Sequence, residues 1–289
     1  MIATSLALLL TQAGPLVIGG SAPPITSAPL PIPHAPRTAP ASAAPEPSKL
    51  QLCLSAIDES PLSAIEAAEE WRKLTKGAPS AEPNHCLGVA YNRLGRPAEA
   101  ELAFNAAREA LPTSEPVRRA SFGAMAALAV VEQGETARAD AVFATALAEA
   151  RNGGDARLAG DIAIDRARTQ VALKQDSAAA AGLAEGRTAS PDNPAGWLLS
   201  ATLARRQSQL AEAQRYIQRA ADLAPFDPDV GLEAGVIAVL GGRDEAARKS
   251  WLSVLKVAPE SEQAKVAQGY IDQLGPVPVA VPLAVPQGR

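Results

Sequence analysis

The sequence predicts an all-α protein in which short helix-turn-helix units stack one after another and end in a capping helix. Pro191, Pro225 and Pro259 recur at an interval of 34 residues, and a fixed interval of this length is typical of a repeat protein. The residues that precede each proline recur at the same interval: an alanine stands twelve positions before it and a large apolar side chain eight positions before it. Small and large apolar positions at constant spacing predict helices that pack against one another in the same way in every unit.

The composition narrows the classes of function. The chain has 289 residues, 47% apolar and 20% charged, with a formal net charge of −4 and no long basic run, so it lacks the positive patch that binds nucleic acid. Its two cysteines, Cys53 and Cys86, are too far apart in sequence for a zinc knuckle or a C-x-x-C redox pair. We therefore expect no nucleic-acid partner, metal or cofactor.

Both ends differ from the middle of the chain. Residues 1–20 hold an apolar run from Ile2 to Leu10 and resemble a secretory signal peptide, although Thr11, Gln12 and Pro15 interrupt the run. The interruption disfavours a membrane span in the mature form, and an uncleaved inner-membrane anchor remains the alternative. Residues 21–47 and 276–289 are rich in proline, which predicts a disordered linker and a disordered tail. Export predicts a periplasmic or secreted protein rather than a cytoplasmic one.

One unit carries the repeat most completely. Residues 81–114 contain Leu87, Gly88, Tyr91, Gly95, Ala100, Phe104, Ala107 and Pro112. This set resembles the tetratricopeptide repeat, whose pattern is W-x-x-L-G-x-x-Y, then A-x-x-x-F, then P, with only the opening tryptophan missing. The resemblance implies a right-handed superhelical α-solenoid of about six repeats.

The same register places the remaining units. Repeats are expected near 48–80, 81–114, 120–153, 160–193, 194–227 and 228–261 within a solenoid at 48–275, with a cap at 262–275 that carries Val266, Tyr270, Ile271 and Leu274 on one face. Three residues depart from the pattern. Arg151 stands where the third unit should end in proline, and Arg166 and Gly186 occupy positions of the fourth unit that are usually small or apolar.

Candidate catalytic groups are few. His85 and Cys86 are neighbours, but adjacent helical residues point about 100° apart and no third ligand joins them, so we expect an exposed histidine and a packing cysteine. The carboxylates Asp161 and Asp165, and the group Glu66, Glu69 and Glu70, are expected on helix surfaces. Gly95, Gly134 and Gly242 are expected in the turns between helices. The chain is therefore interpreted as non-catalytic.

Cys53 and Cys86 share the sixth position of neighbouring first helices. In an oxidising compartment this register favours a disulfide. Stacked helices lie about 8–10 Å apart, which exceeds disulfide reach unless the short first helix is displaced. A bonded pair and two free thiols both remain open.

The resemblance also implies a binding groove lined by the first helix of each repeat. Carried over by position, it is formed by His85, Val89, Asn92, Arg93, Ala124, Leu128, Val131, Arg168, Val171, Leu198, Thr202, Arg205, Arg206, Leu232, Val236 and Val239. An apolar lining with Arg168, Arg205 and Arg206 near its centre suits a partner segment that carries acidic groups, although the arginines could equally solvate the face.

These observations favour a scaffold or adaptor that holds a peptide or helix of a partner protein in the groove. Two other classes stay open: a structural, self-associating component of a cell-envelope complex, and a subunit of a helical enzyme. A fold alone does not decide among them.

Overall fold

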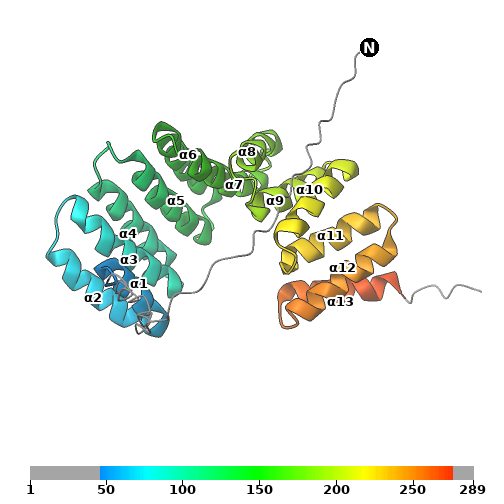
Figure 1. The fold of residues 1–289 in the computed structure, drawn as a ribbon, viewed down its shortest axis with the longest axis horizontal. Coiled ribbons are helices and arrows are strands. Elements are labelled where there is room, and N and C mark those ends of the chain that lie inside the picture. The colour runs from blue at the N-terminus through cyan, green and yellow to red at the C-terminus, as the bar shows by residue number, and fades with distance from the viewer. Residues whose placement is uncertain (1–45, 276–289) are drawn as a thin grey trace, which may run out of the picture. The chain divides into compact units, whose positions relative to one another are not determined.

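The computed structural model describes residues 46–275. The expected signal peptide, all but the last two residues of the expected linker at 21–47, and the expected tail at 276–289 lie outside the described residues. Within that range the chain is helical from α1 to α13, without a β-strand, and successive helices lie antiparallel in pairs (Figure 1). This is an α-solenoid, as the repeat pattern predicts.

Each repeat contributes two helices. They are α1 (Lys49–Glu59), α2 (Pro61–Lys73), α3 (Ala81–Arg93), α4 (Pro97–Ala110), α5 (Pro116–Glu132), α6 (Thr136–Asn152), α7 (Ala156–Ala172), α8 (Asp176–Ala189), α9 (Pro194–Arg206), α10 (Leu210–Leu223), α11 (Pro228–Leu240), α12 (Asp244–Val257) and α13 (Glu262–Leu274), with a 3₁₀ turn at Ala78–Ser80. Helix α13 lies within the range 262–275 expected for the cap.

Local sequence explains where the helices begin. Asn193 caps α9 by accepting a hydrogen bond from the backbone N–H of Ala195 at 3.0 Å, and Asp227 does the same for α11 from the N–H of Val230 at 3.2 Å. A proline follows each cap in the first turn, where its missing N–H costs nothing and its fixed φ suits the helix. The starting points of these helices are therefore encoded locally.

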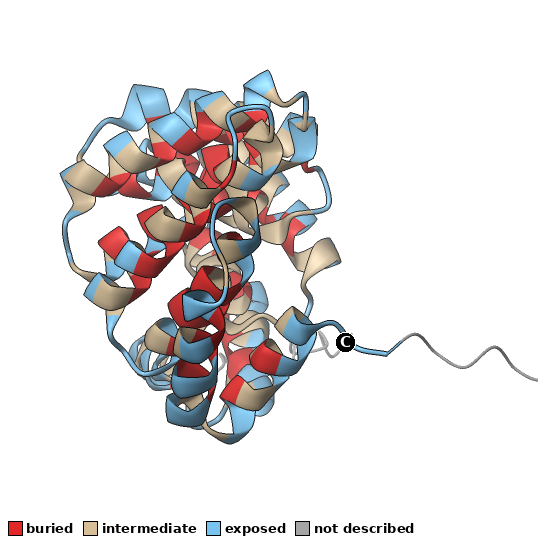
Figure 2. Ribbon diagram, turned by 90° about the vertical axis from the view of Figure 1, so that its left-hand side faces the viewer, coloured by how far each residue is buried: buried red, intermediate tan, exposed pale blue. Residues whose placement is uncertain are grey.

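A small residue facing a large one joins the two helices of a repeat. Gly88 of α3 lies against the ring of Phe104 of α4, and Gly235 of α11 lies against the indole of Trp251 of α12. A β-carbon at either glycine would overlap the aromatic ring. Buried residues consequently form continuous bands between the helices, drawn in red in Figure 2.

The middle repeats are longer than the 34-residue pattern predicts. Both α5 and α7 begin ahead of the expected boundaries at 120 and 160, and α6 continues to Asn152 because Arg151 replaces the proline that would stop it. Gly186 belongs to the core here: Ile164 of α7 fills the space that its missing side chain leaves. Arg166, the other unusual residue, pairs with Asp140 of α6 at 2.8 Å.

The turns between helices contain residues in the left-handed region. Gly95, Gly134 and Gly242 have positive φ in these turns, as expected, but Lys174 and Ser208 take the same conformation with φ of 59° and 62°. This conformation costs a residue with a side chain about 1 kcal/mol relative to glycine.

We expect Lys174→Gly and Ser208→Gly each to raise the free energy of unfolding by about 0.5–1 kcal/mol in urea denaturation, and a loss of stability in both would contradict this.

An ion network joins α4, α5 and α6. Glu149 accepts hydrogen bonds from Arg108 at 2.6 and 2.9 Å and from Arg119 at 3.1 Å. Arg119 also donates to the backbone oxygens of Arg108 and Leu111 at the end of α4. Burial acts to raise the pKa of Glu149, but the hydrogen bonds and charges of the two arginines outweigh it and hold that pKa below its usual range.

We expect Glu149→Gln to lower the free energy of unfolding by about 1–2 kcal/mol at pH 7, because two partly buried guanidinium groups lose their counter-charge. Since the folded-state pKa of Glu149 lies below the unfolded-state value, its contribution is complete above the unfolded-state pKa and is lost as pH falls through the folded-state pKa. Melting curves from pH 7 to pH 3 should therefore converge for the two proteins. As a control, Glu185→Gln removes the exposed pair with Arg151 and should change stability by less than about 0.5 kcal/mol.

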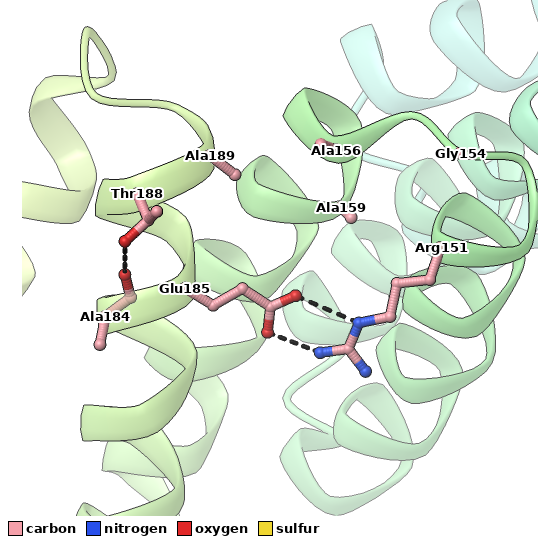
Figure 3. A pocket seen from close by; sticks show the side chains of 8 residues that line it. All are labelled: Arg151, Gly154, Ala156, Ala159, Ala184, Glu185, Thr188 and Ala189. Carbon is pink, nitrogen blue, oxygen red and sulfur yellow. Dashed lines mark hydrogen bonds and ion pairs between the residues drawn. The ribbon is translucent and has the colours of Figure 1, made fainter.

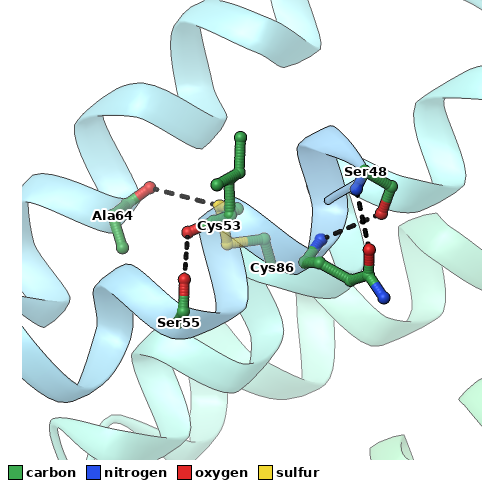
Figure 4. Close-up of a disulfide and its surroundings, with 7 residues drawn as sticks. Ser48, Cys53, Ser55, Ala64 and Cys86 are labelled. Atoms are coloured by element: carbon green, nitrogen blue, oxygen red, sulfur yellow. Dashed lines mark hydrogen bonds between the residues drawn. A yellow bond between two sulfur atoms is a disulfide. The ribbon is translucent and has the colours of Figure 1, made fainter. Parts of the chain in front are cut away.

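The first helix is fastened by a disulfide. Cys53 of α1 and Cys86 of α3 are bonded, with their Cα atoms 6.2 Å apart (Figure 4). The distance is shorter than the 8–10 Å spacing of regular stacked helices because α1, with 11 residues, packs against α3 as well as α2. Around the bond, Ile57, Trp71 and Leu87 belong to the same buried cluster.

At the other end, α13 closes the solenoid through Ala264 and Ala267, which are buried against α12. Tyr270, Ile271 and Leu274 pack against the same cluster. Val266, which was expected on the same face, is 43% exposed and is not part of this cluster. Across residues 46–275, every helix is too short or too polar to cross a bilayer.

Candidate functional site

The odd-numbered helices form one surface of the solenoid. From α5 onward each of them contacts the next odd-numbered helix, whereas no two even-numbered helices make contacts of that extent within residues 46–275. The odd-numbered helices are the first helices of the repeats, so the residues that the resemblance assigns to a groove belong to this surface. We call it the inner face.

A cavity of about 320 Å³ opens on the inner face across three consecutive first helices. Four of the expected groove residues line it, namely Arg168 from α7, Leu198 and Thr202 from α9, and Leu232 from α11. The other lining residues are Ala195, Leu199, Asp229 and Glu233. The lining combines apolar side chains with three charged ones, which is the make-up of a site for a peptide or helix.

The charges of this cavity differ from the expectation. Arg205 is bound by Glu233 through two hydrogen bonds of 2.6 and 3.1 Å, and Arg168 lies 3.4 Å from a carboxylate oxygen of Asp165. Burial raises the pKa of Asp165, and the charge of Arg168 opposes that shift. Only Arg206 of the three expected arginines has no ion-pair partner in the part of the chain that the structure describes.

The sequence reasoning missed the sixth position of the expected repeats that begin at residues 160, 194 and 228. Asp165, Leu199 and Glu233 occupy it in three successive repeats, and each touches the cavity or an arginine beside it. Asp229, which also lines the cavity and stands four positions before Glu233 on α11, was missed as well. The 34-residue spacing of the repeats could have identified these residues, because it places Leu199 and Glu233 at equivalent positions of neighbouring first helices.

The remaining expected residues lie elsewhere. Val236 lines a second cavity of about 350 Å³ between α11 and α13. Asn92 and Arg93 are exposed at the end of α3, where Arg93 lies 3.7 Å from Asp58. Leu128 on α5 is 38% exposed, and Val171 on α7 is half-buried. The structure thus gathers four of the expected residues at one cavity and distributes the others along the inner face.

His85 is not the exposed residue that the sequence predicts. Its ring centroid lies 5.3 Å from that of Phe122 and 6.5 Å from that of Phe104, and burial lowers its pKa while the charge of Glu82 opposes that shift. Cys86 beside it is fully buried and bonded to Cys53. Over residues 46–275, no three side chains of His, Cys, Asp or Glu converge as metal ligands would.

A larger cavity of about 590 Å³ lies between α6, α7 and α8 (Figure 3). Half of its lining residues are alanines, among them Ala156, Ala159 and Ala184. Across it, Glu185 accepts two hydrogen bonds from Arg151, at 2.5 and 3.1 Å. Arg151, which replaces the proline expected at this position of the repeat, therefore forms an ion pair with Glu185. This replacement was the feature of the sequence that could have indicated the pair.

Comparisons with known proteins support the fold. No family of known proteins matches the sequence, and no curated protein does either. Among solved structures, PilW, described as a widely conserved type IV pilus biogenesis factor, superimposes with a TM-score of 0.61 at 18% identity, over 76% of this chain and 96% of PilW. PilF of Pseudomonas aeruginosa gives 0.61 at 14% identity, over 76% of this chain and 95% of PilF. A tetratricopeptide repeat protein from Parabacteroides merdae gives 0.57 at 16% identity, over 78% of this chain and 84% of its own.

Proposed function

The chain has the tetratricopeptide-repeat fold, and from this premise we propose that it is a non-catalytic scaffold that holds a segment of a partner protein on its inner face. The observation that carries the proposal is the cavity across α7, α9 and α11, because one extended or helical segment laid over it would contact three repeats at once. Leu198, Leu199 and Leu232 would receive its apolar side chains.

The charges around the cavity limit which segments fit. Asp229 and Arg168 place one acidic and one basic side chain in the lining of the cavity, so a segment with both basic and acidic side chains matches it better than a purely acidic one. Arg205 already neutralises Glu233 and is therefore a poor anchor for a partner carboxylate. Arg206, which is exposed at the end of α9, is a better anchor for a carboxylate of the partner.

The test is in-cell cross-linking of the tagged full chain, followed by mass spectrometry. One variant carries Arg168→Glu and Arg206→Glu on the inner face and leaves the Arg205–Glu233 pair intact. The matched control carries Arg215→Glu and Arg219→Glu, which change the charge equally on α10, a helix that does not line the cavity. We expect at least about tenfold less partner recovered with the first variant and no change with the second, as a loss of about 1.4 kcal/mol implies.

Equal recovery in all three proteins would overturn the groove assignment. Recovery of only the chain itself, together with light scattering that rises with concentration, would favour the alternative of a self-associating component of an envelope complex.

We further propose that the protein works in the periplasm or outside the cell. Residues 1–20 resemble a signal peptide, and a buried Cys53–Cys86 bond suits an oxidising compartment. Fractionation of cells that express the full chain tests this: recovery in the osmotic-shock fluid supports it, recovery in the membrane pellet supports an uncleaved anchor, and recovery in the cytosol overturns it.

A further inference from the structure

The second cavity of the inner face has a lining without charge. Val236, Val239 and Leu240 of α11 form one wall, Tyr270 and Leu274 of α13 form the other. Trp251 lies beneath them and Gln273 completes the lining. The cavity measures about 350 Å³, and Leu240 at its edge is 52% exposed.

The helix that forms the first wall is apolar on every side at this point. Ile237 and Ala238 face the core, yet the residues on the opposite side, Val236, Val239 and Leu240, are apolar as well. A helix that is apolar all round is normally covered all round. An uncharged patch of this kind beside aromatic rings indicates an occupant.

The chain that follows α13 has a pattern that fits such a surface. From residue 277 to residue 285 every odd position is valine or leucine, and every even position is proline or alanine. In an extended backbone, side chains alternate between two sides, so this pattern puts a stripe of branched apolar side chains on one side. The prolines exclude a helix, and the only charged side chain after Gly275 is Arg289.

The position of this segment favours it over any other occupant. It starts directly after Leu274, which lines the cavity, and Gly275 turns the backbone there with a φ of 69°. Residues 276–289 can extend about 46 Å at about 3.3 Å per residue, which is more than twice the length of α13 at about 1.5 Å per residue. The length of the segment, its lack of charged side chains before Arg289 and its alternating side-chain pattern therefore all fit the uncharged cavity.

We propose that residues 277–285 of the same molecule fold back and lie extended in the cavity between α11 and α13, with their odd-numbered side chains against Val236, Val239 and Tyr270. The prolines fix φ in the undocked segment as well, so less conformational entropy is lost when the segment docks. The segment would then cover the C-terminal part of the inner face and compete there with any partner of the proposed function.

The location is tested by cross-linking in the full chain with a short bismaleimide. Cys53 and Cys86 are bonded to each other, so added cysteines are the reactive thiols. Val279→Cys and Val281→Cys are each combined with Leu240→Cys at the cavity or with Leu252→Cys as the matched control. Leu252 is 50% exposed on α12 and lies one helical turn from Arg248, which donates a hydrogen bond to the backbone oxygen of Gly275, so both sites are near the start of the tail.

We expect cross-links to Leu240→Cys to form at least about tenfold faster than those to Leu252→Cys, at a rate independent of protein concentration. Adding Val236→Asp should reduce the faster rate to that of the control. Equal rates at the two sites would overturn the proposal, and a rate that rises with concentration would assign the cavity to a second copy of the chain instead.

The side of the segment that faces the cavity is tested by thiol labelling. Single variants Val279→Cys and Val281→Cys should react several-fold more slowly than Ala280→Cys and Ala284→Cys, because only the odd positions are covered. Uniform labelling would contradict an extended, docked segment. Neither experiment needs a partner protein, so the result stands independently of the proposed scaffold function.

Discussion

Replacing Trp251 with alanine is expected to lower the free energy of unfolding by about 3–5 kcal/mol, the usual cost of deleting a buried tryptophan side chain. The indole is 3% exposed and packs against Tyr270, with ring centroids 5.1 Å apart. Its Nε1 donates a hydrogen bond of 3.1 Å to the backbone oxygen of Leu232, and this bond would be lost. Urea denaturation measures this loss of stability. In hydrogen exchange we expect the amides of α11, α12 and α13 to lose protection first, since each repeat is stabilised by its neighbours.

The glycine opposite this side chain provides the reciprocal change. Gly235→Ala places a methyl group on the indole of Trp251, and we expect it to cost about 1–3 kcal/mol through overpacking. Gly269→Ala on α13 is the matched control, because nothing lies within 4 Å of its missing β-carbon. That substitution should stabilise the helix by up to about 1 kcal/mol. Equal effects of the two substitutions would show that helix propensity, and not contact with Trp251, sets the outcome.

The architecture could be predicted because its determinants are local and repeat. Pro194 and Pro228 mark helix starts, and pairs such as Gly88 with Phe104 stand sixteen positions apart within one unit, so sequence spacing alone indicates which residues touch. Helix α13, Glu262–Leu274, likewise lies within the range 262–275 expected for the cap. Where the pattern fails, as at Arg151, the helix simply continues to Asn152.

The candidate site was less accessible to sequence reasoning because its properties come from contacts between repeats. Arg205 has the spacing of a groove residue, but its charge is already satisfied by Glu233 of the next first helix. Likewise, His85 looks like a surface residue until Phe122 of α5 is placed against it. Such pairings depend on how one repeat is placed on the next, which the pattern within a single repeat does not specify.

Cleaving the Cys53–Cys86 bond is expected to lower the free energy of unfolding by about 3–4 kcal/mol, because the bond closes a loop with a sequence separation of 33 residues in the unfolded chain. The loss should be concentrated in the first repeat, since the bond joins the short α1 of that repeat to α3. Trp71, which is 8% exposed in the same cluster, provides a fluorescence signal for this region.

Two measurements check the bond and its effect. In unreduced, denatured protein we expect no thiol to react with maleimide, and two to react after reduction; two reactive thiols before reduction would contradict the bonded pair. Urea denaturation with and without reductant then gives the energy, with the Cys53→Ala, Cys86→Ala double variant as a control that reductant should leave unchanged. If reduction left the wild-type midpoint unchanged as well, buried contacts of Ile57 and Trp71 would suffice to hold α1 in place, and the bond would add nothing to the stability of the first repeat.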